Sequence, residues 1–511
     1  MKKYMLTGIV ALMSIVLLSC SGDRGTVATD TQTLIDIVGS RKSTIFTVAF
    51  DRYGSDTGEL PIGVFDSGIG GLTVLAEIIK LDHFNNETHK PGPDGIPDFK
   101  NERFIYLGDQ ANMPYGNYPS ENKTAFLLEL VIKDAVFLLG QRYWLSDQAQ
   151  SPRLDKPPVK AIVIACNTAT AYGLDDVRDA VRRWKLPVSV IGVVEAGAQG
   201  AVEALAGEGK SGVVAVMATV GTCASEGYVR AVDQSAKRAG VAPPEVVQQG
   251  CLGLASAVEG DRSYITPPGS GTPVEYRGPA FGNSAAPIDT AMIARYGFDM
   301  SCILGDDHDP TTWRLNSIEN YIRYHTAALS EQYRLSGARE PIAAVILGCT
   351  HFPYRRDSIA ASFARLRSFR DKDGAEPYRA VIADSLIFID PSELTAEQLY
   401  QTLAASGLLL DADRKPVIAF DEFYISVPNA GLGEIRTIDG KAFTYEYKYG
   451  REPGRFDVEY VKRVPMSRDN LSESVMENIR ETMPGVWERL VRFNRESDRC
   501  RELPSSARIE R

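Results

Sequence analysis

Short apolar runs recur along the middle of the chain and alternate with segments of helical periodicity. Six runs have the length of buried strands: residues 61–65, 104–107, 161–165, 188–193, 212–216 and 343–347. In the segment that follows the first run, residues 72–80, the apolar positions have the spacing of a helix that buries one face. Apolar strands that alternate with helices predict parallel sheets covered on both faces. We therefore expect an α/β fold, with its functional residues at the carboxyl ends of the strands.

Three regions interrupt this pattern. Residues 81–101 and 260–313 are rich in Gly, Pro and polar residues, which indicates two insertions. After about residue 412, aromatic and polar positions alternate over 443–449 and again over 456–460, which predicts an antiparallel hairpin with an aromatic face. A helix is expected over 472–493. We expect residues 412–511 to form a small C-terminal α+β extension packed on the main body.

The first twenty residues have the pattern of an export signal. Lys2 and Lys3 precede an apolar run over 5–18 that is too short for a comfortable membrane span. The run ends in Leu-Leu-Ser-Cys, which looks like a bacterial lipobox with Cys20 as the lipidated first residue of the mature protein. A simple cleaved signal with an incidental cysteine is the alternative. The expected organisation is a signal peptide over 1–20, a tether and N-terminal extension over 21–59, and a membrane-anchored lipoprotein of the outer membrane that faces the periplasm.

The length, the charge and the cysteine count of the chain bear on its domain number, its partners and its disulfides. A chain of 511 residues is too long for one ordinary core, so more than one domain is expected. The formal net charge is −10 and no basic stripe offsets it, which argues against a nucleic-acid partner. Without Cys20, six cysteines remain, an even number that three disulfides could use in an exported protein. A disulfide between Cys302 and Cys500 stays open on sequence grounds.

Two cysteines stand in a context that points to chemistry instead. Cys166 follows a predicted strand in Ile-Ala-Cys-Asn-Thr-Ala, and Cys349 follows another in Leu-Gly-Cys-Thr-His-Phe-Pro. A cysteine between a strand and the start of a helix gains from the helix dipole, which favours the thiolate. Two such thiols that face each other across a cleft suit a reaction that needs a base and an acid on opposite faces of one carbon. The alternative for either cysteine alone is an inert place in the core.

Four motifs, in this order, resemble the glutamate racemases of the aspartate/glutamate racemase superfamily. They are Ile-Gly-Val-Phe-Asp-Ser-Gly-Ile-Gly-Gly-Leu-Thr-Val-Leu at 62–75, Tyr-Leu-Gly-Asp leading to Pro-Tyr-Gly at 106–116, Cys-Asn-Thr-Ala at 166–169 and Gly-Cys-Thr-His at 348–351. The resemblance covers roughly residues 60–405 without the two insertions. It implies two pseudo-symmetric parallel-sheet α/β domains with the active site in the cleft between them. The expected bounds are 60–182, completed by 354–411, for the first domain and 183–353, with the insertion 260–313, for the second.

The resemblance also implies roles for individual residues. Cys166 would take the Cα proton of the D enantiomer and Cys349 that of the L enantiomer, with no cofactor and no metal. Asp66 would assist Cys166, whereas His351 and Glu259 would assist Cys349. The implied substrate-binding residues are Ser67, Pro114, Tyr115, Gly116, Asn167, Thr168, Thr219, Thr222 and Thr350.

Other interpretations are weaker or stay open. The loop 67–71 lacks the Gly-Lys-Ser/Thr ending of a phosphate loop, the run Asp306-Asp307-His308-Asp309 has no regular ligand spacing, and the segment 94–98 only faintly resembles a calcium repeat. Ala169-Thr170 and His351 favour glutamate over aspartate, and a racemase for another amino acid is the alternative. A binding lipoprotein for amino acids or cell-wall fragments, or a scaffold for a partner, would not need two opposed thiols. The expected partners are a small amino-acid substrate, the membrane through Cys20, and, as an open assembly state, a second copy of the chain.

Overall fold

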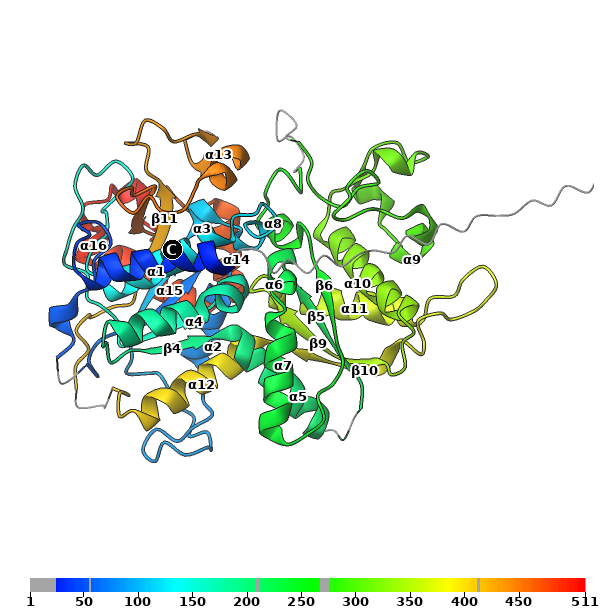
Figure 1. The fold of residues 1–511 in the computed structure, drawn as a ribbon, viewed down its shortest axis with the longest axis horizontal. Coiled ribbons are helices and arrows are strands. Elements are labelled where there is room, and N and C mark those ends of the chain that lie inside the picture. Colours follow the sequence, from blue (N-terminus) through cyan, green and yellow to red (C-terminus); the bar gives the residue numbers. More distant parts are fainter. Residues whose placement is uncertain are drawn as a thin grey trace, which may run out of the picture.

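The computed structural model describes two α/β domains that lie side by side (Figure 1). The described residues are 24–510 apart from 55–56, 208, 210, 267–274, 411–413 and 439, with side chains described from residue 31 onward. The export signal and Cys20 therefore lie outside the described residues. None of the helices within the described ranges is long and apolar enough to cross a membrane.

The first domain is built on a six-stranded sheet in the order β14-β11-β2-β1-β3-β4. Neighbouring strands are parallel except β14, which is antiparallel to β11. The strands are β1 (Ile62–Asp66), β2 (Phe104–Gly108), β3 (Ala161–Ile164), β4 (Ser189–Gly192), β11 (Glu422–Pro428) and β14 (Val461–Pro465). Val64 and Phe65 of β1 belong to two different hydrophobic cores, one on each face of the sheet. The sheet is therefore covered on both sides, as its apolar strands predict.

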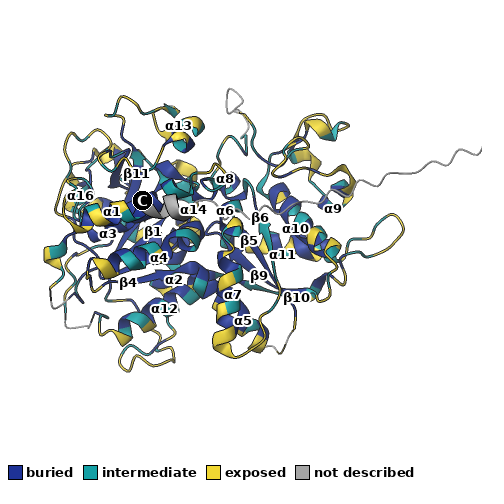
Figure 2. Ribbon diagram, viewed as in Figure 1, coloured by how far each residue is buried: buried dark blue, intermediate teal, exposed yellow. Residues whose placement is uncertain are grey.

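Helices from both ends of the chain cover this first sheet. One face carries α1 (Arg24–Gly39), α3 (Thr124–Leu139) and α4 (Asn167–Arg183). The other carries α2 (Leu72–Lys80), α12 (Pro391–Ala405), α14 (Glu473–Thr482) and α15 (Pro484–Glu496). Their buried faces turn toward the sheet and their exposed faces toward solvent (Figure 2).

The second domain repeats the central topology of the first. Its sheet has the order β10-β9-β5-β6, with all strands parallel. The strands are β5 (Val213–Ala218), β6 (Val246–Gly250), β9 (Ile342–Gly348) and β10 (Ile382–Ile389). In both domains the spatial order is second, first, third, fourth strand, so the expected pseudo-symmetry holds for four strands in each domain. Helices α5 (Val193–Gly207) and α7 (Gly227–Ala239) cover one face, and α10 (Ile318–Leu335) and α11 (Arg356–Arg367) the other.

Two of the expected domain bounds were wrong. β4, expected in the second domain, pairs with β3 of the first sheet. β10, expected in the first domain, pairs with β9 of the second. The apolar pattern locates a strand but does not say which sheet it joins, because that depends on pairing across the whole chain. Residues 183–192 therefore belong to the first domain and residues 354–389 to the second.

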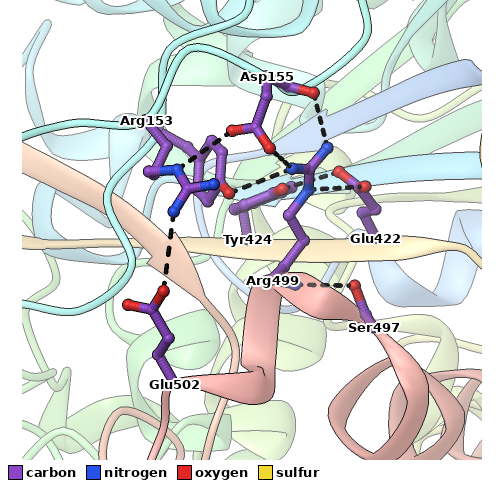
Figure 3. A network of polar contacts seen from close by, with 8 residues as sticks. Arg153, Asp155, Glu422, Tyr424, Ser497, Arg499 and Glu502 are labelled. Atoms are coloured by element: carbon purple, nitrogen blue, oxygen red, sulfur yellow. Dashed lines mark hydrogen bonds and ion pairs between the residues drawn. The ribbon is translucent and has the colours of Figure 1, made fainter.

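The C-terminal segment is not a separate extension. β11 pairs in parallel with β2, so residues 422–428 continue the first sheet and place β14 at its edge. Near the chain end, α16 (Asp498–Arg501) carries Arg499, which reaches Glu422 on β11 and Asp155 in the loop before β3 (Figure 3). The Arg499 Nε donates to Glu422 Oε1 at 3.1 Å. This segment therefore completes the first domain.

The predicted aromatic hairpin over 443–460 was wrong as well. The structure has a short helix, α13 (Tyr445–Gly450), whose first turn is capped by the Thr444 hydroxyl. Aromatic residues at every second position also include pairs four residues apart, and such pairs are neighbours on one face of a helix. The rings of Tyr445 and Tyr449 accordingly lie 4.6 Å apart. The helix predicted over 472–493 is split into α14 and α15 at Pro484, because the residue before a proline disfavours helical geometry.

Neither the N-terminal extension nor the larger insertion is a free tether or loop. In α1, Leu34 and Ile35 are buried against the first domain, and Trp184 Nε1 donates to the Ile35 carbonyl at 3.0 Å. In the insertion, Ile288 and Trp313 are buried in the core of the second domain. The remaining short elements are α6 (Val220–Ala224), α8 (Leu254–Val258), α9 (Ile293–Tyr296), β7 (Ile303–Leu304), β8 (Arg314–Leu315), β12 (Thr437–Ile438) and β13 (Ala442–Phe443).

Candidate active site

The two cysteines occupy equivalent positions in the two domains. Cys166 follows β3, the third strand of the first domain, and Cys349 follows β9, the third strand of the second. Both are nearly buried, with 5% and 6% of their surface exposed. They lie close enough that a charge on Cys349 raises the pKa of Cys166. The pseudo-symmetry of the fold therefore brings the two predicted catalytic thiols into one site between the domains.

Cys166 lies in a buried environment dominated by a carboxylate. Asp66, at the end of β1, accepts from the amides of Gly68 at 3.3 Å and Gly71 at 2.9 Å through one oxygen, Oδ2. Its other oxygen, Oδ1, is buried without a partner among the described residues. Burial, and after it the charge of Asp66, raises the pKa of Cys166, whereas hydrogen bonds from Ala169 and Ser67 oppose the shift. This environment keeps Cys166 as the neutral thiol.

Burial also raises the pKa of Asp66 itself, although the neighbouring His351 opposes that shift. The loop after β1 is tightly packed against Asp66 and against His351 of the second domain. A Cβ atom on Gly71 would lie 2.5 Å from Asp66 Cβ, and one on Gly70 would lie 2.8 Å from the His351 ring. A side chain at Gly70 would push His351 of the second domain away, whereas one at Gly71 would displace Asp66 within the first domain.

Cys349 has a basic partner instead. Its Sγ lies 3.5 Å from His351 Nδ1, and His351 Nε2 lies 2.6 Å from Glu259 Oε1. Burial alone lowers the pKa of His351, but the hydrogen bonds to Cys349 and Glu259 outweigh it and hold the pKa well above its ordinary value. The second thiol thus has an imidazolium beside it, oriented by a carboxylate. Glu259, at the end of α8, takes this place although the larger insertion begins directly after it.

Three threonines join the domains on the other side of the site. The hydroxyl of Thr168, at the start of α4, lies 3.0 Å from those of both Thr219 and Thr222 in the second domain. The hydroxyls of Thr219 and Thr222 lie 2.9 Å apart, and Thr219 caps the first turn of α6 by accepting from the Thr222 amide. Asn167 is held across the same boundary, because its Oδ1 accepts from Tyr228 at 2.6 Å. These predicted binding residues come together across the two domains, and their hydroxyl groups hydrogen-bond to one another. We call this the closed arrangement.

The loop 114–116 contributes backbone rather than side chains. The Tyr115 hydroxyl lies 2.6 Å from both Asp109 Oδ2 and Asp134 Oδ2, with its ring in the core of the first domain. Burial and the charge of Asp109 raise the pKa of Asp134 to about 8. Asp134 therefore keeps a proton at neutral pH, which is shared within the group of Asp109, Tyr115 and Asp134. Gly116 abuts Thr219, where a Cβ atom would come within 2.6 Å. Pro114 and Gly116 thus border the site, whereas the Tyr115 side chain points away from it.

Thr350 and Ser67 complete the set of predicted site residues. A Cβ on Gly70 would lie 2.6 Å from Thr350 Oγ1, which places this hydroxyl at the contact between the domains. Ser67 lies beside Cys166 and donates to it. Both side chains are nearly buried, with 7% and 8% of the residue exposed. All fourteen predicted catalytic and substrate-binding residues therefore belong to one region at the carboxyl ends of the strands.

Two residues at this site had not been singled out from the sequence. Gln110 donates from Nε2 to Glu259 Oε2 at 2.9 Å, across the domain boundary. Its signal was its position directly after the strand-end Asp109. Lys448, on α13, donates to the Met113 carbonyl, and burial lowers its pKa to about 8. No local pattern points to Lys448, because only the C-terminal fold brings α13 to the loop 113–116.

The insertion and the C-terminal segment meet at the edge of the site. The Arg277 guanidinium, from the insertion, lies 3.8 Å from the ring centroid of Tyr445 on α13. It also lies 3.8 Å from the Glu446 carboxylate. The Tyr449 hydroxyl donates to the Pro114 carbonyl at 3.4 Å. The insertion and the C-terminal segment thus contact each other between the domains. We call this contact, between Arg277 and Tyr445, the clasp.

The structure also tests the other cysteine and metal interpretations. All six described cysteines are free thiols, and Cys302 lies in the insertion whereas Cys500 is in the first core. Asp306 and Asp309 accept from backbone amides two residues ahead, which is typical of a solvated loop. Within the described ranges, donor atoms converge at His83, Glu393 and Glu397, all within 4.8 Å. This group is partly exposed and already hydrogen-bonded, with His83 Nδ1 2.5 Å from Glu397 Oε1, so it gives no positive sign of a metal site.

Comparison with known proteins shows what parts of the chain resemble. Residues 140–261 match the Asp/Glu/Hydantoin racemase family. A glutamate racemase of Enterococcus faecalis is 37% identical over 175 residues, which are 34% of this chain and 47% of that protein. One of Levilactobacillus brevis is 26% identical over 363 residues, 70% of this chain and 84% of that protein. A solved glutamate racemase from Bacillus anthracis is 24% identical, with a TM-score of 0.40, over 72% of this chain and 88% of that one. The chain thus spans about half the length of the first of these relatives.

Proposed function

We propose that this chain, which carries an Asp/Glu/Hydantoin racemase domain, interconverts the L and D forms of a free amino acid, glutamate before any other. The observation that carries the proposal is the placement of two thiols at equivalent strand ends in one site, with different acid/base partners. A binding protein has no need of such a pair.

In the proposed reaction one cysteine removes the Cα proton as thiolate while the other returns a proton from the opposite face as thiol. For the L enantiomer, Cys349 beside the His351 imidazolium accepts the proton, and the Cα–H electron pair stays on the carbon. Neutral Cys166 then donates its proton to that carbon from the other side, which inverts the centre and leaves the thiolate at 166. Positioned acid/base groups of this kind contribute roughly 10²–10⁴-fold in rate.

The site offers binding groups for both charged ends of the substrate. Asp66 Oδ1, buried and without a partner among the described side chains, is an acceptor for the substrate ammonium. The threonine hydroxyls of residues 168, 219 and 222 and the amides at helix starts are donors for carboxylates. Because these threonines bond one another in the closed arrangement, substrate would enter when the two domains open and would replace those bonds.

The decisive experiment is exchange of the Cα proton. The chain without residues 1–20, kept under reducing conditions, is incubated in deuterated water with L- or D-glutamate, and deuterium at Cα and optical rotation are followed together. We expect both enantiomers to exchange and to reach a racemic mixture. Exchange with aspartate but not glutamate would correct the substrate. Absence of exchange with any common amino acid would favour a binding lipoprotein that captures amino acids or cell-wall fragments.

We also propose that Cys20 anchors the chain as an exported lipoprotein of the outer membrane, facing the periplasm. The proposal is supported by the basic head, the short apolar run and the Leu-Leu-Ser-Cys ending. Labelled palmitate should enter the wild-type chain and be lost in Cys20→Ala, with Cys302→Ala as the matched control that keeps the label. Label that survives Cys20→Ala would contradict the anchor. A homodimer remains a prediction, and sedimentation of the chain without residues 1–20 tests it.

A further inference from the structure

A run of four side chains connects the first domain to Cys349. Gln110 opens the short turn that follows β2 and belongs to the first domain. Its Nε2 donates to Glu259 Oε2 at 2.9 Å, and Glu259 belongs to the second domain. The other oxygen of Glu259 lies 2.6 Å from His351 Nε2, and His351 Nδ1 lies 3.5 Å from Cys349 Sγ. The group beside the second thiol is therefore held from across the cleft.

The orientation of the Gln110 amide follows from its partner. An ionised carboxylate only accepts hydrogen bonds, so Gln110 has to present its NH₂ group to Glu259. The amide oxygen then points elsewhere, and it is buried without a partner among the described residues. A buried acceptor left unpaired costs free energy. The side chain therefore keeps this position for the contact with Glu259, not to satisfy its own hydrogen bonds.

The local fold does not depend on Gln110. The turn that carries it is held by the Ser426 hydroxyl, which accepts from the Ala111 amide at 3.0 Å. Asn112 also bonds Asp109 through its side chain, at 2.8 and 3.0 Å. Apart from Glu259, the described contact of the Gln110 amide is a long one to Met113 Sδ, at 3.7 Å. Substitution at 110 should thus leave the turn in place.

We propose that Gln110 is a positioning residue for Cys349: it fixes the carboxylate of Glu259, and thereby the His351 ring, only when the two domains are closed. The inference rests on the proposed racemase function and deepens it. Proton transfer at Cys349 becomes dependent on closure, whereas the amides that hydrogen-bond to Asp66 and Cys166 belong to the first domain. The His351 ring beside Cys349 is therefore fully held in place only when substrate is enclosed.

The test compares Gln110→Met, which keeps length and loses the donor, with Ser426→Ala, which removes a hydrogen bond to the same turn without touching Glu259. We expect Gln110→Met to lower kcat by about 10- to 100-fold, since small misplacements of catalytic groups have effects of this size. The values of kcat/KM for the two enantiomers must fall together, because the equilibrium constant is one. Kinetics with Cα-deuterated substrates separates the two proton transfers.

In Gln110→Met the primary isotope effect on kcat/KM should rise for deuterated L-glutamate, whose deuteron goes to Cys349, and fall for deuterated D-glutamate. In Ser426→Ala both isotope effects should equal those of the wild type. Isotope effects that shift equally for both enantiomers in Gln110→Met, or no change in kcat, would overturn the inference while wild-type racemisation keeps the proposed function. A wild type that does not racemise would overturn both.

A second variant guards against misfolding of the first. Gln110→Glu keeps the shape but places a second carboxylate beside Glu259. We expect its activity relative to the wild type to fall as the pH rises, because one carboxyl must be protonated for the two to share a hydrogen bond. A pH-independent ratio of the two activities, in a variant that melts like the wild type, would contradict the role of Gln110 as a donor.

Discussion

The two halves of the site hold chemically identical thiols in opposite environments. Around Cys166 the charge with the largest effect is the Asp66 carboxylate, and burial together with that charge raises the pKa of the thiol. Around Cys349 the neighbour is His351, whose pKa is held above its ordinary value by Cys349 and Glu259 despite burial. A pseudo-symmetric fold thus produces an asymmetric pair of surroundings: a carboxylate beside the Cys166 thiol and an imidazolium beside Cys349. One proton shared by the pair is what two-base racemisation requires.

Removal of either sulfur should have the largest effect on racemisation. Cys166→Ser and Cys349→Ser should each reduce racemisation by about 10³-fold or more, because a hydroxyl at neutral pH replaces neither the base nor the acid. Optical rotation with both enantiomers measures the loss. Cys302→Ser, which changes a thiol of the insertion, should keep full activity. Full activity in either site variant would rule out the two-base assignment.

Removing His351 should act mainly on the Cys349 side of the site. His351→Asn should lower kcat by about 10²-fold, because the imidazolium that favours a thiolate beside it is lost. The acidic limb of the pH–rate profile should move to higher pH. His308→Asn, at an exposed histidine of the insertion, is the matched control. An unchanged acidic limb in His351→Asn would remove the proposed difference between the two thiols.

The same substitution has a pH-dependent effect on stability. The pKa of His351 lies above its ordinary 6.5 in the folded chain, so its pairing with Glu259 contributes fully below about pH 6.5. That contribution is lost as the pH rises through the raised pKa. The difference in unfolding free energy between wild type and His351→Asn, from urea titrations, should therefore shrink in alkaline solution. A difference that grows with pH would contradict the ion pair.

A milder change makes the two environments more alike. Asp66→Asn removes the charge that, after burial, raises the pKa of Cys166. The basic limb of the pH–rate profile, where Cys166 loses its proton, should move to lower pH. The KM should rise about tenfold because an acceptor for the substrate ammonium loses its charge, at about 1.4 kcal/mol per tenfold. Asp98→Asn, in the smaller insertion, serves as the control; a basic limb that stays in place in Asp66→Asn would exclude its electrostatic role.

The smallest expected effect concerns the clasp next to the 349 side. Arg277→Ala removes the contact with the Tyr445 ring, worth about 0.5–1 kcal/mol at a partly exposed site. Activity should fall less than threefold, since the contact borders the site without entering it. A double-mutant cycle with Tyr445→Ala, read by urea unfolding, isolates the pair. A coupling energy of zero would mean that the two segments merely touch.

Much of the site could be predicted from the sequence because it is local in sequence. Each catalytic residue other than Glu259 ends an apolar strand or stands within three residues after one, and such strands are recognised by composition alone. No strand end points to Glu259, because it follows a short helix and the insertion begins beside it. The sequence does not single out Gln110 or Lys448, because each contacts a partner far away along the chain. The partner is 149 residues away for Gln110 and 335 residues away for Lys448.

The sequence by itself determined the α/β class, six of the ten strands in the two main sheets and the two thiols with their immediate neighbours, because apolar runs and motif residues act over a few positions along the chain. Only the tertiary structure decided which strand joins which sheet, that residues 422–465 complete the first domain, and that Tyr445–Gly450 is a helix. It alone decided how burial and nearby charges act on the pKa values of Cys166 and His351. The reason is physical: a pKa depends on burial and on charges within a few ångströms, and residues distant in sequence supply both at this site.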